Sequence, residues 1–434
     1  MTHVKGHHMK AQARVLQRKS EHIVTDSNPS SAGDLLGSSS LQNAGRSGKK
    51  QRHKPVAKMN RMRAAVHNRE MVVGLLSTLG PASQVRLAQL TQLRTSTVSY
   101  IIRELQARGL VREGGALPAD RVGRKQTLIE ISPSAAWSVG LSLDTTGNKL
   151  CLMNAVGHII GQYSFPAAPD ITEFLNQVPS LLSQLVPQAN LSREKAVGIT
   201  VSVPGVVDPF AGMVLNSMSL HLANFPLAKQ LRGKVDQPVM VERNTTCGAY
   251  AERFLGCARN CDHFLYFSAR PQITADSKGR WYSFGLAMIM NGELYRGHNS
   301  AAGELHSSSF LQPMEGDAGA VLSGPFVQQK EIATVLRPLG RRLAYLVDVL
   351  DPEMLVLSSD DWLLTDENLG ILKETILESL IPVANRELEI ARSPLGMDGV
   401  LFGAALLSLH RGLKRRLNPS FPEAIEQAAP DENS

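Results

Sequence analysis

The chain has 434 residues, 43% of which are apolar, and it carries a formal net charge of +7 at neutral pH. It contains no uncharged apolar run near the roughly 20 residues of a membrane-spanning helix, and its charged N-terminus does not resemble a secretory signal. These features argue against membrane and exported proteins, and they predict a cytoplasmic protein of two or three domains.

The charge is distributed unevenly along the chain. Residues 1–125 contain 22 Lys and Arg against 7 Asp and Glu, whereas the rest of the chain contains 24 against 32. This polarity predicts that the N-terminal part meets a polyanion and that the remainder is an ordinary acidic domain.

Both ends of the chain have compositions typical of disorder. Residues 1–60 are rich in Ser, Gly, Lys, Arg and His without an apolar period, and they predict a disordered basic arm. An alternative is that translation starts at Met59 or Met62 and the arm is not made. Residues 418–434 predict a disordered acidic tail.

Residues 61–132 predict three helices and a hairpin. The first helix has apolar residues at helical spacing and stops at Gly80-Pro81, and the second, SQVRLAQLTQ, follows with Ser83 as its N-cap. Gln92 stands in the next turn, where glycine would more easily adopt a left-handed conformation. The buried face of the third helix comprises Val98, Ile101, Ile102 and Leu105.

The other side of this third helix carries hydroxyls and one forked cation, groups suited to phosphates and base edges in a major groove. The predicted DNA contacts are Thr95, Ser96, Ser99, Tyr100 and Arg103, with Arg124 in the loop of the hairpin. The module is therefore predicted to be a winged helix-turn-helix. The alternative is a domain that docks protein and has a merely solvated basic face.

Residues 136–415 alternate short apolar runs with amphipathic segments of helix length, which is the pattern of an α/β fold with two lobes. The predicted strands include VGLSLD, LCLMNAVG, AVGITVSV, PVMVE, HFLYFS, LAMIM and MLVLSS. The four cysteines are too few for a disulfide framework. Cys257, Cys261 and His263 have some metal-ligand character, but reduced structural thiols are the preferred interpretation.

Several ordered motifs resemble the ROK family of repressors and sugar kinases, in its xylose and N-acetylglucosamine repressor branch. They include GITVSVPGVVD, FPLAKQL, PVMVERNTTCGAYAERFLG, NGELYRGHNSAAGEL, DPEMLVLSS and FGAALLSL. The resemblance implies an N-terminal winged helix-turn-helix followed by an actin-like or hexokinase-like two-lobed domain with a ligand cleft, in a homodimer or homotetramer.

The chain departs from the kinases of this family at four places. Asn244 stands where the resemblance implies the Asp that removes the proton of the sugar hydroxyl, and an amide has no useful basicity. The phosphate-site segments are also changed: Asp144 to Asn148 has lost a glycine and the Thr, Ser358-Ser359 replaces a glycine pair, and SKGRWYSFG replaces T-G-T-G. No enzymatic activity, catalytic residue or cofactor is therefore expected.

The family's zinc motif is also altered, because the segment AGELHSSSFLQPMEGDAGA has no cysteine after His306. No metal is expected there. The resemblance implies that Asn244 and Glu304 bind the ligand, and His306 is either a third ligand-binding residue or an ordinary loop histidine. Because other sugar-binding positions are replaced, three alternatives stay open: a sugar or sugar-like effector, another small molecule, or no physiological ligand.

These observations predict a cytoplasmic, nucleoid-associated transcriptional regulator, in the main a repressor, that binds a pseudo-palindromic operator in double-stranded DNA. An effector in the cleft between the lobes is expected to control it. The alternative is an ATP-dependent sugar kinase with a fused DNA-binding domain.

Overall fold

The computed structural model describes residues 54–116, 127–167, 170–272, 281–305, 327–328, 332–359, 364–383 and 386–418. The chain divides into two units, residues 1–62 and 63–434. Helix α2 begins at Lys54. The predicted boundary of the basic arm is therefore wrong, since residues 54–60 are helical, while residues 1–53 and the predicted acidic tail beyond Asn418 lie outside the described residues.

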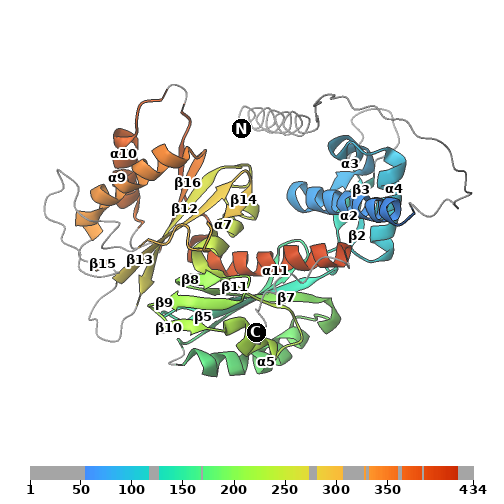
Figure 1. The fold of residues 1–434 in the computed structure, drawn as a ribbon, viewed down its shortest axis with the longest axis horizontal. Coiled ribbons are helices and arrows are strands. Elements are labelled where there is room, and N and C mark those ends of the chain that lie inside the picture. Colours follow the sequence, from blue (N-terminus) through green and yellow to red (C-terminus); the bar gives the residue numbers. More distant parts are fainter. Residues whose placement is uncertain are drawn as a thin grey trace, which may run out of the picture. The chain divides into compact units, whose positions relative to one another are not determined.

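The N-terminal module consists of three helices and a small antiparallel sheet with the strand order β1-β3-β2 (Figure 1). Its elements are α2 (Lys54–Leu79), β1 (Ala82–Ser83), α3 (Gln84–Thr91), α4 (Thr95–Ala107), β2 (Val111–Ala116) and β3 (Thr127–Ile131). The three predicted helices and the predicted hairpin are all present. This is the element order expected of a winged helix-turn-helix.

Local chemistry explains where these helices begin and end. Gly80 follows the last residue of α2 with φ of 77°, a left-handed conformation that glycine adopts without a steric penalty. The Ser83 hydroxyl accepts a hydrogen bond from the backbone N–H of Arg86 at 3.2 Å and caps α3 as predicted. Gln92 adopts φ of 57°, the left-handed turn expected at this position.

The first lobe of the α/β part is built on a five-stranded sheet with the order β11-β7-β4-β5-β6. Its strands are β4 (Trp137–Ser142), β5 (Asn148–Asn154), β6 (Ile159–Phe165), β7 (Ala196–Val203) and β11 (Val239–Arg243). Strands β4, β7 and β11 run parallel, and β5 and β6 are antiparallel to their neighbours. A three-stranded sheet accompanies it, with the strands β8 (Val206–Asp208), β9 (Met213–Ser217) and β10 (Leu222–Phe225).

Two helices of this lobe, α5 (Ile171–Gln188) and α6 (Leu227–Arg232), contribute to the same apolar core as the five-stranded sheet. Central strands such as β7 are buried on both faces, which accounts for their continuous apolar sequence. Asp144 follows the carboxyl end of β4 by two residues.

The second lobe has a sheet with the order β14-β13-β12-β16-β17, and β15 pairs with β13. Its strands are β12 (Phe264–Gln272), β13 (Trp281–Met290), β14 (Glu293–Tyr295), β15 (Val327–Gln328), β16 (Met354–Ser358) and β17 (Glu389–Arg392). Helices α9 (Ile332–Leu350) and α10 (Asp366–Ser379) pack on each other beside this sheet (Figure 1).

Two further helices, α7 (Asn244–Phe254) and α11 (Gly399–Leu417), pack against each other between the two large sheets (Figure 1). A Cβ atom at Gly403 would lie 1.7 Å from the carbonyl oxygen of Cys247, so a larger residue would push the two helices apart. Helix α11 also shares a cluster of buried apolar side chains with α2 and α4 of the N-terminal module. Among the described residues, no helix is both long and apolar enough to cross a membrane.

Candidate functional site

Helix α4 has one buried face and one exposed face. Val98, Ile101, Ile102 and Leu105 are buried, as predicted from their spacing. The predicted DNA contacts Thr95, Ser96, Tyr100 and Arg103 are exposed, whereas Ser99 is half-buried. The Tyr100 side chain is 65% exposed, which is unusual for a large ring. The exposed face therefore presents hydroxyls, a phenol and a guanidinium together.

Two polar contacts fix α4 within the module. The Ser99 hydroxyl donates to Oε1 of Gln84 on α3 at 2.7 Å, and Nη1 of Arg69 on α2 donates to both carboxylate oxygens of Glu104 at 3.0 and 3.2 Å. The Ser99 hydroxyl thus connects α4 to α3. The position of Ser99 in the sequence does not predict this contact. A helix held by both neighbouring helices can present its exposed face in a constant orientation.

Arg103 has only a local partner for its guanidinium. Its Nε donates to the backbone carbonyl of Ser99 at 3.3 Å, one turn earlier in the helix, and it forms no ion pair within the described part of the chain. Its remaining donors are therefore available. Arg124 lies outside the described residues, although the hairpin that leads to its loop is present and Arg112 pairs with Glu130 near the base at 2.7 Å.

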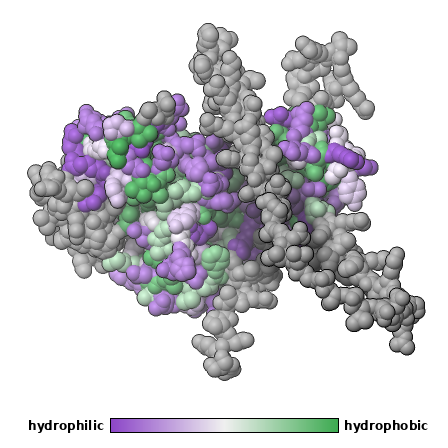
Figure 2. All heavy atoms as spheres, turned by 45° about the horizontal axis from the view of Figure 1, so that its top comes forward, coloured by the Kyte–Doolittle hydropathy of each residue, from purple (hydrophilic) through white to green (hydrophobic). Residues whose placement is uncertain are grey.

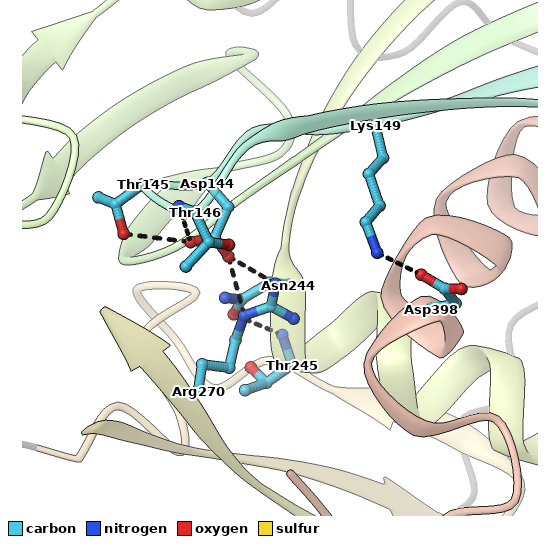
Figure 3. Close-up of polar contacts among 8 residues, drawn as sticks. All are labelled: Asp144, Thr145, Thr146, Lys149, Asn244, Thr245, Arg270 and Asp398. Carbon is cyan, nitrogen blue, oxygen red and sulfur yellow. Dashed lines mark hydrogen bonds and ion pairs between the residues drawn. The ribbon is translucent and has the colours of Figure 1, made fainter. Parts of the chain in front are cut away.

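Figure 3 shows the side chains that meet between the two lobes. Asn244 is the first residue of α7 and is 8% exposed. Its Oδ1 accepts a hydrogen bond from the backbone N–H of Thr245 at 2.7 Å, so this oxygen helps to satisfy a donor at the start of the helix. The amide can bind a hydroxyl group through its nitrogen, but it cannot take up a proton as a carboxylate would.

A buried ion pair joins the two lobes across this site (Figure 3). Asp144 follows β4 of the first lobe and Arg270 lies on β12 of the second lobe. Nε and Nη2 of Arg270 donate to Oδ2 of Asp144 at 3.1 and 2.5 Å, and both side chains are less than 10% exposed. Charged groups this deeply buried require such a partner. The pair therefore links the two lobes at this point.

Glu304, a predicted ligand-binding residue, also has an arginine partner. Nη1 of Arg243 donates to Oε1 of Glu304 at 3.0 Å, and Nη2 donates to the carbonyl oxygen of Ala302 at 2.6 Å. Arg243 is 2% exposed and is the last residue of β11. Next to it, Arg296 donates to Oε2 of Glu242 at 3.1 and 2.6 Å.

Three carboxylates at the boundary between the lobes are thus paired with arginines of the same chain. Asn244 and Glu304 both lie at this boundary, whereas His306 lies outside the described residues. Sequence reasoning missed Arg243 and Arg270. A charged residue that ends an otherwise apolar strand was the available signal, since Arg243 directly precedes Asn244 and Arg270 follows the apolar run of β12.

No group of three or more His, Cys, Asp or Glu side chains in the described ranges gathers in a way that could hold a metal ion. The Cys257 thiol lies 3.4 Å from a carboxylate oxygen of Glu252, and burial, with the charge of Glu252, raises its pKa to about 12. This thiol is therefore protonated at neutral pH, which does not favour metal binding there.

Comparison with known proteins places the chain in a family context. The model of the ROK family matches residues 138–308. The chain is 26% identical over 225 residues to a protein named putative xylose repressor from Caldicellulosiruptor sp., covering 51% of this chain and 53% of the relative. It is 26% identical over 241 residues to the xylose repressor of Bacillus subtilis, covering 55% and 59%. The matched region thus spans little more than half of these two relatives.

A longer match links the chain to the DNA-binding transcriptional repressor Mlc of Escherichia coli, with 21% identity over 386 residues, 78% of this chain and 92% of the relative. A crystal structure of a ROK family transcriptional regulator, described as a homologue of that protein, superposes with a TM-score of 0.63 at 18% identity and covers 84% of this chain and 99% of the other. The ROK hexokinase of Thermus thermophilus gives 0.50 at 20% identity, covering 64% and 99%. These superpositions show a shared fold.

Proposed function

We propose that this protein is a DNA-binding transcriptional regulator, and more specifically a repressor. The proposal proceeds from the premise that residues 138–308 form a ROK family domain. The observation that carries the proposal is the exposed face of α4 in a helix-turn-helix arrangement. The names of the relatives, which include two xylose repressors and Mlc, support it. A regulator of this kind acts on the chromosome, in the cytoplasm.

In this proposal α4 is the recognition helix and enters the major groove. Its residues Thr95 and Ser96 bond to phosphates or base edges through their hydroxyls, and Tyr100 adds a polar aromatic contact. Because the Ser99 hydroxyl donates its hydrogen to Gln84, Ser99 can contact DNA only by accepting a hydrogen bond from a base. Arg103 donates in a fork to a guanine, the commonest specific contact of arginine. Arg124 contacts phosphate or the minor groove from the wing. The positive charge of residues 1–125 supplies attraction that depends on salt rather than on sequence.

We further propose that the protein binds as a homodimer, or as a homotetramer built from such dimers, to a pseudo-palindromic operator. An apolar surface supports self-association. Figure 2 shows exposed hydrophobic side chains on the half of the molecule where Figure 1 shows α9 and α10. The exposed large residues of these helices are Tyr345, Val349 and Leu377, and Ile381 and Val383 follow α10. Exposed apolar side chains on two helices that pack on each other are typical of an association site.

A small effector in the cleft between the lobes is the proposed control of DNA binding, with Asn244, Glu304 and His306 as its ligands. A sugar or sugar-like molecule suits these polar groups. Because Glu304 pairs with Arg243 and Asp144 pairs with Arg270, the effector must share or displace these arginines. An effector that breaks the Asp144–Arg270 pair would favour an open arrangement of the lobes. DNA affinity would change only as far as the effector distinguishes the two arrangements.

The competing function is phosphoryl transfer from ATP to a sugar. Two features weigh against it: the carboxylate of Asp144 is paired with Arg270, and the family resemblance puts the amide of Asn244 where a kinase would have its general base. A coupled assay of ADP release with a panel of hexoses tests it. Turnover above background would favour the kinase.

The regulator is tested by selection of genomic fragments with the purified protein. The expected result is enrichment of a few intergenic fragments that share an inverted repeat. Uniform recovery of the genome would contradict sequence-specific regulation, and the genes beside the enriched fragments would indicate the pathway and its inducer.

A further inference from the structure

A cavity of about 350 Å³ lies away from the paired carboxylate of Asp144, where α11 meets the first lobe. Its walls come from α11, from β7 and β11, from the turn after β8, from Tyr250 of α7, and from the segment after β14. Small-molecule sites typically have about 300–1,000 Å³. Neither Asn244 nor Arg270 lines this cavity, and of the residues described at the lobe boundary only the Glu242–Arg296 pair does.

The cavity has an excess of positive charge. Three cations line it, Arg296, Arg411 and Lys414, against the single carboxylate of Glu242. Glu242 already pairs with Arg296 through two hydrogen bonds. Arg411 and Lys414 take part in no ion pair within the ranges that the structure describes. Two cations of the lining are therefore uncompensated.

Arg411 is the cation whose surroundings are least favourable. Its Nη1 contacts the sulfur of Met240 at 3.5 Å, and its buried Nε has no hydrogen-bond partner among the described residues. Burial lowers the pKa of Arg411, and the charges of Arg415 and Arg296 lower it further. A half-buried guanidinium that faces cations and a thioether is stabilised when an anion binds beside it.

The rest of the lining is largely apolar or uncharged. Phe210, 55% exposed, Pro209, Met240 and Leu407 supply an aromatic ring and aliphatic surface. His410 adds no charge at neutral pH, because burial, together with the charge of Lys414, lowers its pKa to about 4. The cavity thus combines a cationic end with a wall suited to a compact organic body.

We propose that this cavity binds a small organic anion, in which a phosphate or carboxylate group pairs with Arg411 and Lys414 and the body of the molecule packs against Phe210 and Leu407. The charge excess selects for the anionic group. The volume admits a body of about the size of a monosaccharide, and a bare inorganic ion would leave the apolar wall unused.

The position of the cavity would allow a bound anion to influence the N-terminal module. A second cavity, of about 440 Å³, shares five lining residues with it, namely Tyr250, Arg296, Leu407, His410 and Lys414. Its other lining residues include Glu70, Val73, Gly74, Ser77 and Thr78 of α2. An anion at Lys414 therefore adjoins the side chains that support α2. Any regulatory effect of the anion rests on the proposed function, whereas its binding does not.

Binding is measured by isothermal titration calorimetry of the full chain without DNA. The probes are glucose 6-phosphate and gluconate as organic anions, glucose as the neutral body, and inorganic phosphate as the bare ion. The variants are Arg411→Gln and Lys414→Gln, with Arg259→Gln as a control. Arg259 is exposed, has the carbonyl oxygen of Leu255 as its only acceptor within the described ranges, and does not line the cavity.

At least one organic anion is expected to bind the wild type, more tightly than glucose or inorganic phosphate. Affinity should fall at least tenfold in Arg411→Gln and several-fold in Lys414→Gln, with no change in Arg259→Gln. Equal affinity in wild type and Arg411→Gln, binding of inorganic phosphate alone, or no binding of any probe would overturn the proposal.

A parallel titration with duplex DNA separates this inference from the proposed function. If Arg411→Gln weakens DNA binding while no organic anion binds the wild type, the cavity contacts the DNA backbone and the proposal is wrong. If organic anions bind and DNA does not, the cavity site stands and the proposed function fails.

Discussion

Arg270 on β12 donates two hydrogen bonds to one carboxylate oxygen of Asp144 behind β4, and the pair links two lobes that are otherwise built on separate sheets. The Nη1 atom of the same guanidinium is buried without a hydrogen-bond partner among the described residues. In this chain an arginine supplies the positive charge beside that carboxylate.

Removal of one partner of this pair should destabilise the protein strongly. Arg270→Met leaves a buried carboxylate without its cation, and we expect a loss of about 3–5 kcal/mol in the free energy of unfolding, measured by urea denaturation. The double variant Arg270→Met with Asp144→Leu removes both charges and should recover most of that loss. A double variant no more stable than the single one would show that the pair is not the cause.

Acid should destabilise the protein through His410. Burial, with the charge of Lys414, lowers the pKa of this histidine to about 4 in the folded protein, against an ordinary value of about 6.5. Between pH 6.5 and pH 4 the imidazole of His410 is protonated in the unfolded chain but neutral in the folded protein. The free energy of unfolding is therefore highest above about pH 6.5 and decreases as the pH falls towards 4. Protonation of His410 accounts for about 3 kcal/mol of this decrease.

The matched variant is His410→Phe, which keeps a ring against Phe254, whose centroid lies 4.6 Å from that of His410, but has no proton to gain. Its Tyr250 hydroxyl loses the contact with Nδ1 of His410 at 2.7 Å, so the variant starts from a lower stability. The slope of unfolding free energy against pH between 6.5 and 4 should be smaller than in the wild type. Parallel slopes would rule out His410 as the source.

Self-association should depend on the apolar surface of α9 and α10. Val349 is 60% exposed, and Val349→Glu places a charge within that surface. We expect the variant to shift from dimer or tetramer to monomer in light scattering coupled to size-exclusion chromatography. Met218→Glu, at a residue 51% exposed on the first lobe, is the control and should leave the mass unchanged. The same mass for Val349→Glu as for the wild type would place the interface elsewhere.

Specific DNA binding should depend on Arg103. Its guanidinium has only the Ser99 carbonyl as a partner within the described part of the chain, so Arg103→Ala removes little from the folded module. Affinity for the selected operator should fall by about 1–3 kcal/mol, with a smaller effect on unrelated DNA. Arg259→Ala serves as the control for charge. An operator affinity equal to that of the wild type would remove Arg103 from the contacts.

The sequence predicted the N-terminal module well because its signals are local. Apolar spacing located the buried face of α4, and Ser83 and Gly80 marked helix ends through their own backbone chemistry. Strands buried on both faces, such as β7, were equally evident as apolar runs. Strand β6 was missed, since its alternating exposure gives no such run.

The contacts of the cleft were harder to predict because each depends on partners far apart in the sequence. Asp144 and Arg270 are 126 residues apart, and Arg243 and Glu304 are 61 apart. The position of these arginines near the ends of apolar strands is a local signal, but it does not identify the partner, because the carboxylate that makes burial tolerable comes from another element. The hydrogen bond between Ser99 and Gln84 could not be predicted for the same reason, because it connects two helices.

The account depends most directly on DNA binding, and the measurement that tests it is the affinity of the purified full chain for duplex oligonucleotides in low salt and at increasing ionic strength. We predict binding at low ionic strength whose logarithm falls linearly with the logarithm of salt concentration, together with tighter binding to the selected inverted repeat than to a scrambled duplex. A chain that shows no affinity for duplex DNA at low ionic strength would contradict the account.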